Sequence, residues 1–270
     1  MPGKNDLTPL TYALLSGLTI LVPIPFLDDW LKSQVQRRMV VQTLKAHGFS
    51  AAPEEIDRLV PTEEAGCLRG CLLSGVVYVV KKLIRQLIPL LEWSRAVDTV
   101  SQTYYHGYLV DYALRHARYQ PADLRQAARI QYAIQQARRS TNTRFISQAI
   151  RQTLERSRKT VWETARWLGK EINRSVFRRG RAALTGLLLG AIRRLPGSWQ
   201  TRLSQRFKLE PVEEKLEEII DNAPARQQTA FDRLLGDLQQ AIASTSEQPL
   251  RLLEEHFEQA LATPPLHLAD

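Results

Sequence analysis

LTPLTYALLSGLTILVPIPFLDD, residues 7–29, is the stretch that decides the fold class of this chain. No charged residue occurs from 7 to 27, and the motif Pro23-Ile24-Pro25 follows the apolar run. Each proline removes a backbone N–H and restricts the residue before it, so an apolar helix over 12–22 should end there. The acidic pair Asp28-Asp29 suits the positive end of a second helix. The stretch therefore predicts two helices joined by a turn.

The apolar run also raises the question of a membrane. Its 21 uncharged residues are about as many as a transmembrane helix needs. Polar and small residues interrupt the run, namely Thr8, Thr11, Ser16, Gly17 and Thr19. We therefore expect a buried or re-entrant element, with an integral membrane segment over 7–27 as the alternative.

Helix signals continue along the rest of the chain. Apolar residues recur at three- and four-residue steps, and prolines and Gly48 mark the ends. A β-branched run at 76–80 makes a strand the competing interpretation there, and Pro89 should kink or end the helix before it. Helices are expected over 28–47, 53–59, 61–88, 93–108, 124–137, 143–176, 211–221, 224–243 and 247–262. The fold class is all-α: a multi-helix bundle with long amphipathic helices and apolar helical hairpins.

Charge divides the chain into three blocks. Residues 1–137 carry 15 Lys or Arg and 12 Asp or Glu, residues 138–208 carry 18 and 3, and residues 209–270 carry 4 and 13. Their net charges of +3, +15 and −9 add to the total of +9. We predict an apolar helical domain over 1–137, a basic amphipathic segment over 138–208 and an acidic helical region over 209–270. Such asymmetry is typical of proteins that bind nucleic acid or membranes, or that pair their own charges.

The basic segment is the candidate binding site. It combines an amphipathic helix over 143–176 with an apolar run over 182–192, which arginine pairs flank and which is too short to span a membrane. Basic amphipathic helices with interfacial aromatic residues lie in the headgroup region of anionic bilayers. The predicted membrane- and anion-binding residues are Arg151, Arg158, Lys159, Trp162, Arg166, Trp167, Lys170, Arg174, Phe177, Arg178, Arg179, Arg181, Arg193, Arg194 and Trp199.

These patterns favour a non-enzymatic, peripheral membrane-associated protein that acts as a scaffold or accessory factor. Nucleic-acid binding through 138–208 is the first alternative, because the same charge would neutralise phosphates. A structural protein–protein interaction module is the second, with the acidic 209–270 block packed against the basic segment or masking it. Deletion of 209–270 should strengthen vesicle binding if the block masks the basic face.

Motifs of catalysis do not occur in the sequence. There is no phosphate-binding glycine loop, no nucleophile elbow, and no pair of the five histidines at metal-binding helical spacing. We therefore expect neither an enzyme nor a cofactor or metal site. The cluster Tyr104, Tyr105, Tyr108 and Tyr112 could stack on bases, but the same spacing suits a helix face in the core.

The start of the sequence and the two cysteines bear on the cellular compartment. No cleavable signal is evident at the start. Cys67 and Cys71 lie four residues apart on one helix face, where they do not readily form a disulfide, so a reducing compartment is expected. The predicted location is the cytoplasm, peripheral to the membrane.

Part of the chain resembles a known family. The motif Ile24-Pro25-Phe26-Leu27-Asp28-Asp29, then Gln36-Arg37-Arg38-Met39-Val40 and Gly48, and finally Lys82-Leu83-Ile84-Arg85-Gln86-Leu87-Ile88-Pro89, is similar to the pattern of the YcjF-like family. The likeness covers residues 7–115. Members are bacterial helical domains that are often encoded beside, or fused to, GTPases. The resemblance implies a membrane-associated helical domain with a GTPase as a possible partner, and it carries no catalytic residues.

Overall fold

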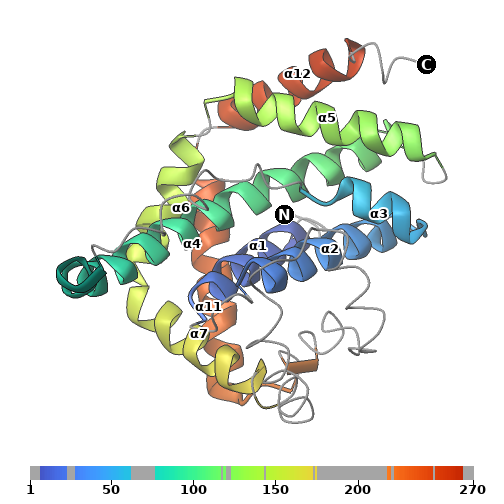
Figure 1. Ribbon diagram of the computed structural model, residues 1–270. Helices are drawn as coiled ribbons and strands as arrows, with labels where there is room; N and C mark the ends of the chain where they lie inside the picture. Colours follow the sequence, from blue (N-terminus) through green and yellow to red (C-terminus); the bar gives the residue numbers. More distant parts are fainter. Residues whose placement is uncertain are drawn as a thin grey trace.

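The computed structural model describes residues 7–22, 28–61, 77–116, 118–119, 123–142, 144–172, 174, 218–219, 222–245 and 247–263. Within these residues the chain forms nine helices and no strand, which confirms the predicted all-α helical bundle (Figure 1). The helices are α1 (Leu7–Ile20), α2 (Asp28–Ala46), α3 (Pro53–Leu59), α4 (Val77–Arg115), α5 (Leu124–Ser140), α6 (Arg144–Arg156), α7 (Arg158–Ile172), α11 (Ala225–Ala243) and α12 (Gln248–Ala262).

Most predicted helices in the described part are observed within a few residues of their predicted ends. α3 begins at its proline as expected, and Gly48 follows α2 with φ of 79°, a left-handed conformation that glycine adopts without strain. Two long elements differ from the prediction. Pro89 does not end its helix, so the segments before and after it form the single helix α4 of 39 residues. A proline inside a helix costs about 3 kcal/mol, yet α4 continues through Pro89 to Arg115.

The basic amphipathic helix expected over 143–176 is interrupted. A turn at Ser157 separates α6 from α7, although the Ser157 N–H still donates to Thr153 O and its carbonyl accepts from the Val161 N–H. The apolar stripe continues across the turn, which is why periodicity alone did not reveal the break.

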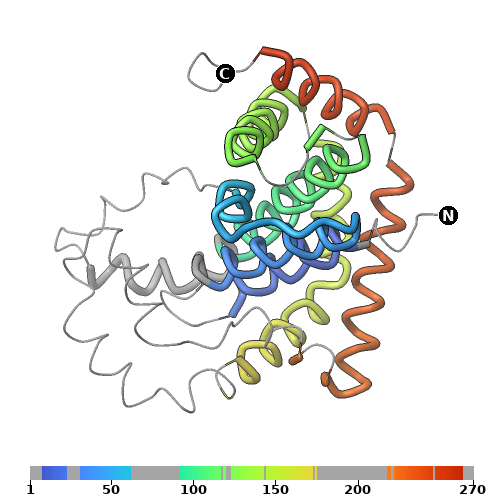
Figure 2. The backbone as a smooth tube through the Cα atoms, turned by 90° about the vertical axis from the view of Figure 1, so that its right-hand side faces the viewer, coloured from blue at the N-terminus to red at the C-terminus, as the bar shows by residue number. Residues whose placement is uncertain are grey.

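The apolar helix α1 lies in the middle of the bundle (Figures 1 and 2). It packs most extensively against α4 and α2, and also against α7 and α11. Leu14, Leu18 and Leu21 are almost completely buried, and the buried Thr19 hydroxyl donates to Ser16 O at 2.8 Å. The uncharged sequence of residues 7–22 is thus explained by burial inside the protein, one of the two forms, buried or re-entrant, expected from the sequence.

Gly17 allows α1 and α4 to pack closely together. A Cβ atom at this position would clash with a methyl group of Val100 and lie 3.1 Å from Ala96 O. Only glycine lets the two backbones approach this closely, because any side chain would push the helices apart. This contact fixes α4 on α1 and thereby orients the elements that pack on both.

One hydrophobic core connects all three charge blocks. Leu14, Leu168 and Leu238 come from the first, second and third blocks and belong to the same cluster of buried residues. Helix α5 also crosses the boundary predicted at 137/138. In the described part of the chain, the blocks therefore differ in charge and share a core.

Several predictions concern residues outside the described ranges. These are the helix start near 61, the cysteines Cys67 and Cys71, most of the 70–80 run, the apolar run 182–192 and most of the 211–221 helix. Among the described residues, no helix combines the length and apolarity that a bilayer crossing requires.

Candidate anion-binding surface

Helices α6 and α7 direct their apolar stripe into the core. They follow one another along one edge of the bundle, with α11 packed against both (Figure 1). The buried residues of the stripe are Ile146, Ile150, Leu154, Val161, Ala165, Leu168 and Ile172. Because these side chains hold the two helices on the protein, the stripe is not free to enter a lipid surface while the bundle is folded.

The outward side of α6 and α7 is strongly basic. Seven Lys or Arg side chains are exposed, against two exposed acidic ones, Glu155 and Glu163. We call these seven the basic face: Arg144, Arg151, Arg156, Arg158, Lys159, Arg166 and Lys170. Five of them were predicted from the sequence, and the structure places all five in solvent. Arg174, also predicted, is exposed just beyond α7.

Some of this charge interacts within the chain. Arg151 lies 3.6 Å from Asp98, and the guanidinium of Arg158 lies 5.3 Å from the centre of the Trp93 ring. Arg174 pairs with Glu171 at 2.9 Å. Exposed pairs of this kind contribute little to stability, and their side chains can turn outward to another anion at small cost.

The aromatic residues predicted for the interface behave differently. Trp162 and Trp167 are half-buried and pack against the core, so much of their surface is already covered. The remaining predicted residues, Phe177, Arg178, Arg179, Arg181, Arg193, Arg194 and Trp199, lie outside the described ranges.

Phe145 is the functional candidate that the sequence reasoning missed. It is 63% exposed, more than the other exposed large hydrophobic residues of the described part, and it stands beside Arg144 on the basic face. A helical wheel reveals it, since at 100° per residue it lies about 140° from the middle of the α6 apolar stripe. An exposed apolar ring next to a basic side chain suits the region where proteins meet lipid headgroups.

The acidic block is not arranged as a simple cover for the basic face. Helix α11 packs against α6 and α7, but an ion pair that joins them has the opposite polarity, with Arg226 of the acidic block 3.8 Å from Glu163. Two acids of α12 contact the first block, where Glu258 pairs with Arg118 at 3.0 Å and Glu254 accepts from the Tyr108 hydroxyl.

The tyrosine cluster belongs largely to the core. Tyr104 and Tyr105 are buried, which confirms that interpretation over a stacking platform for these two residues. Tyr108 and Tyr112 are half-buried under α12. Burial and the hydrogen bond to Glu254 together raise the pKa of Tyr108 above its ordinary value.

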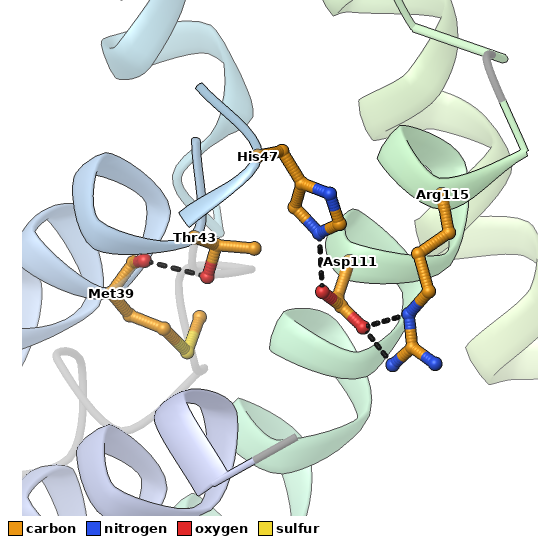
Figure 3. Close-up of polar contacts among 5 residues, drawn as sticks. All are labelled: Met39, Thr43, His47, Asp111 and Arg115. Atoms are coloured by element: carbon orange, nitrogen blue, oxygen red, sulfur yellow. Dashed lines mark hydrogen bonds and ion pairs between the residues drawn. The ribbon is translucent and has the colours of Figure 1, made fainter. Parts of the chain in front are cut away.

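A buried polar cluster ties the end of α2 to α4 (Figure 3). The Asp111 carboxylate is 2% exposed, lies 2.7 Å from His47 Nε2, and accepts hydrogen bonds from the Arg115 guanidinium. Two charge-assisted partners compensate a carboxylate that would otherwise be costly to bury. The hydroxyl of Thr43, in the same view, donates to its own helix at Met39 O (2.8 Å). Because it joins the end of α2 to α4, we interpret the cluster as structural.

Within the described residues, no three His, Cys, Asp or Glu side chains are grouped as metal ligands would be. Comparison of the chain with models of protein families, with curated proteins and with solved structures found no significant match.

Proposed function

We propose that the protein binds anionic membrane surfaces through the basic face of α6 and α7, as a peripheral scaffold or accessory factor without enzymatic activity. The observation that carries this proposal is the separation of the two sides of these helices: the apolar stripe is buried, and seven exposed bases face solvent. The binding is electrostatic. Each base near an anionic leaflet contributes about 1 kcal/mol, so three or four engaged side chains would hold the protein at the surface.

Phe145 favours a membrane over nucleic acid as the anionic surface. An exposed ring next to Arg144 can enter the headgroup region beside the phosphates that the arginine contacts. Nucleic acid offers the same phosphates and remains the competing partner, which a parallel binding assay distinguishes. The location proposed is the cytoplasmic side of a membrane. The resemblance of residues 7–115 to the YcjF-like family also favours association with a membrane, and it suggests a GTPase as a protein partner.

Reversing three charges of the basic face should abolish vesicle binding. We expect the triple variant Lys159→Glu, Arg166→Glu, Lys170→Glu to bind vesicles with one-third phosphatidylserine about a hundredfold more weakly, because at least three contacts of about 1 kcal/mol are lost. Co-sedimentation with vesicles of anionic and of neutral lipid measures this. All three side chains are exposed, so the fold should be unaffected.

A matched variant controls for net charge. Lys45→Glu, Arg58→Glu, Arg125→Glu changes the total charge equally on α2, α3 and α5, and all three residues are exposed. Vesicle binding that falls equally in both triple variants would contradict a localised site. Binding of the wild type to duplex DNA and not to anionic vesicles would reverse the choice of partner.

Phe145→Ala should weaken vesicle binding with little effect on binding to DNA. An exposed ring that enters the interface loses apolar burial of about 1–2 kcal/mol on truncation, equivalent to roughly a fivefold to thirtyfold loss of affinity. Leu124→Ala is the control, since Leu124 is an exposed apolar residue on α5. Unchanged vesicle binding of Phe145→Ala would remove the ring from the proposal.

A further inference from the structure

A cavity of about 310 Å³ lies between α1, α7 and α11. This volume is at the lower end of the range for small-molecule sites. The described residues that line it are Leu15, Leu18, Thr164, Trp167, Leu168, Ala223, Gln227, Gln228, Phe231 and Asp232. Three helices that are far apart in the sequence contribute to it, so its shape is set by the tertiary fold.

The lining changes from apolar to polar. Leu15, Leu18 and Leu168 are buried and apolar, whereas Gln228 and Asp232 are exposed. The aromatic side chains Trp167 and Phe231 stand on α7 and α11, two of the walls. Apolar walls with a few polar groups are typical of sites that bind a small molecule in one orientation.

Two polar side chains of the lining indicate which polar groups a ligand of this cavity would have. Asp232 is the only charged residue among the described lining residues, so it favours a cation at the rim. Thr164 is 3% exposed, and its hydroxyl is buried without a hydrogen-bond partner. Unpartnered buried hydroxyls are costly and uncommon. Threonine in a helix occupies two χ1 rotamers, so this hydroxyl can turn toward a polar atom of a bound molecule.

We propose that this cavity binds a small hydroxylated aromatic amine. The ring would lie against Trp167 and Phe231, its ammonium group would pair with Asp232, and its ring hydroxyl would bond to Thr164. An ammonium near an indole also gains a cation–π attraction. The inference is independent of the proposed membrane binding, because it uses none of the residues of the basic face.

Calorimetry with tyramine tests the site in the full chain. Tyramine should bind the wild type saturably, whereas 3-(4-hydroxyphenyl)propionate, with the same ring and an anionic head, should not bind. Asp232→Asn should weaken tyramine binding about tenfold, because it removes a charge-assisted hydrogen bond. Asp237→Asn, an exposed change elsewhere on the same helix, is the matched control and should bind normally.

Thr164→Val separates the ring hydroxyl from the amine. It should lower the affinity for tyramine to that for phenethylamine, which lacks the hydroxyl, and leave phenethylamine binding unchanged. Because valine has the shape of threonine without an unpaired hydroxyl, the variant should fold at least as stably as the wild type. The proposal is overturned if millimolar tyramine shows no saturable binding, if Asp232→Asn binds it as the wild type does, or if the anionic analogue binds equally well.

Discussion

Acidification from pH 6.5 to pH 4.5 is expected to lower the free energy of unfolding by about 2–3 kcal/mol through one residue, His106. Its ring is completely buried on α4 and bonds through Nε2 to Leu59 O at 2.7 Å. Burial, with the nearby Arg138 charge, lowers its pKa to about 3, against the opposing hydrogen bond to Leu59. Nδ1 has no partner, so a proton added there would place an unpaired N–H and a charge in the core.

The sign of this pH effect follows from the two protonation states. Unfolded histidine takes up a proton below pH 6.5, whereas His106 in the folded protein does so only near pH 3. The unfolded state therefore binds more protons between these values. The contribution of His106 to the free energy of unfolding is therefore fully present above pH 6.5. It is lost as the pH falls from 6.5 to 3, by roughly 4–5 kcal/mol at pH 3.

The variant His106→Gln isolates the effect. Glutamine keeps an N–H donor for Leu59 O and does not titrate, so its loss of stability from pH 6.5 to pH 4.5 should be smaller than that of the wild type. Urea unfolding followed by circular dichroism at a series of pH values measures both slopes, and carboxylates common to the two proteins cancel in the difference. Parallel slopes for wild type and His106→Gln would contradict a neutral buried histidine.

His106 shows what sequence patterns predict and what they leave out. Apolar periodicity correctly predicted helices and their buried stripes, because each depends on residues three or four apart. The surroundings of His106 depend on Leu59, 47 residues earlier, and on Arg138 of another helix. No local pattern contains such a contact, so the sequence offered only a histidine on a helical face.

The basic face was predicted only in part for the same reason. The exposed positions of Arg166 and Lys170 follow from helical periodicity, and the structure places them as expected. Helical periodicity does not predict what the apolar stripe of α6 and α7 packs against, because the same stripe can enter a lipid surface or a protein core. Contacts with α1, α4 and α11 decide for the core. The cavity beside Asp232 could not be predicted at all, since its walls come from three distant segments.

Deletion of the acidic block is a poor test of masking, because the block contributes to the core. Helices α11 and α12 bury five large side chains: Phe231, Leu234, Leu238, Leu253 and Phe257. Removing residues 209–270 would expose the surfaces that these side chains cover, and stronger vesicle binding could then come from newly exposed apolar surface. A point substitution that loosens α12 alone tests the idea more cleanly.

Phe257→Ala is expected to lower the free energy of unfolding by about 3–5 kcal/mol. The ring is fully buried and meets the Tyr112 ring edge-on, at 86° with 5.9 Å between centroids. Through Tyr112 it helps to hold α12 on α4, and α12 also packs extensively against α5 (Figure 2). Truncation leaves a cavity in addition to losing apolar burial. Chemical unfolding measures the loss, and Leu252→Ala on the same helix, at a 38% exposed position, should cost less than about 1 kcal/mol.

The same variant decides whether α12 restrains the basic face. Acids of α12 pair with Arg118 and Tyr108, outside the basic segment. Loosening the helix should therefore leave vesicle binding unchanged at temperatures where the variant stays folded. Stronger binding by Phe257→Ala, absent in Leu252→Ala, would instead show that the acidic helix covers part of the surface. Unchanged binding would indicate that the acidic residues of α12 stabilise the bundle. The basic face would then be accessible to its anionic partner without any movement of α12.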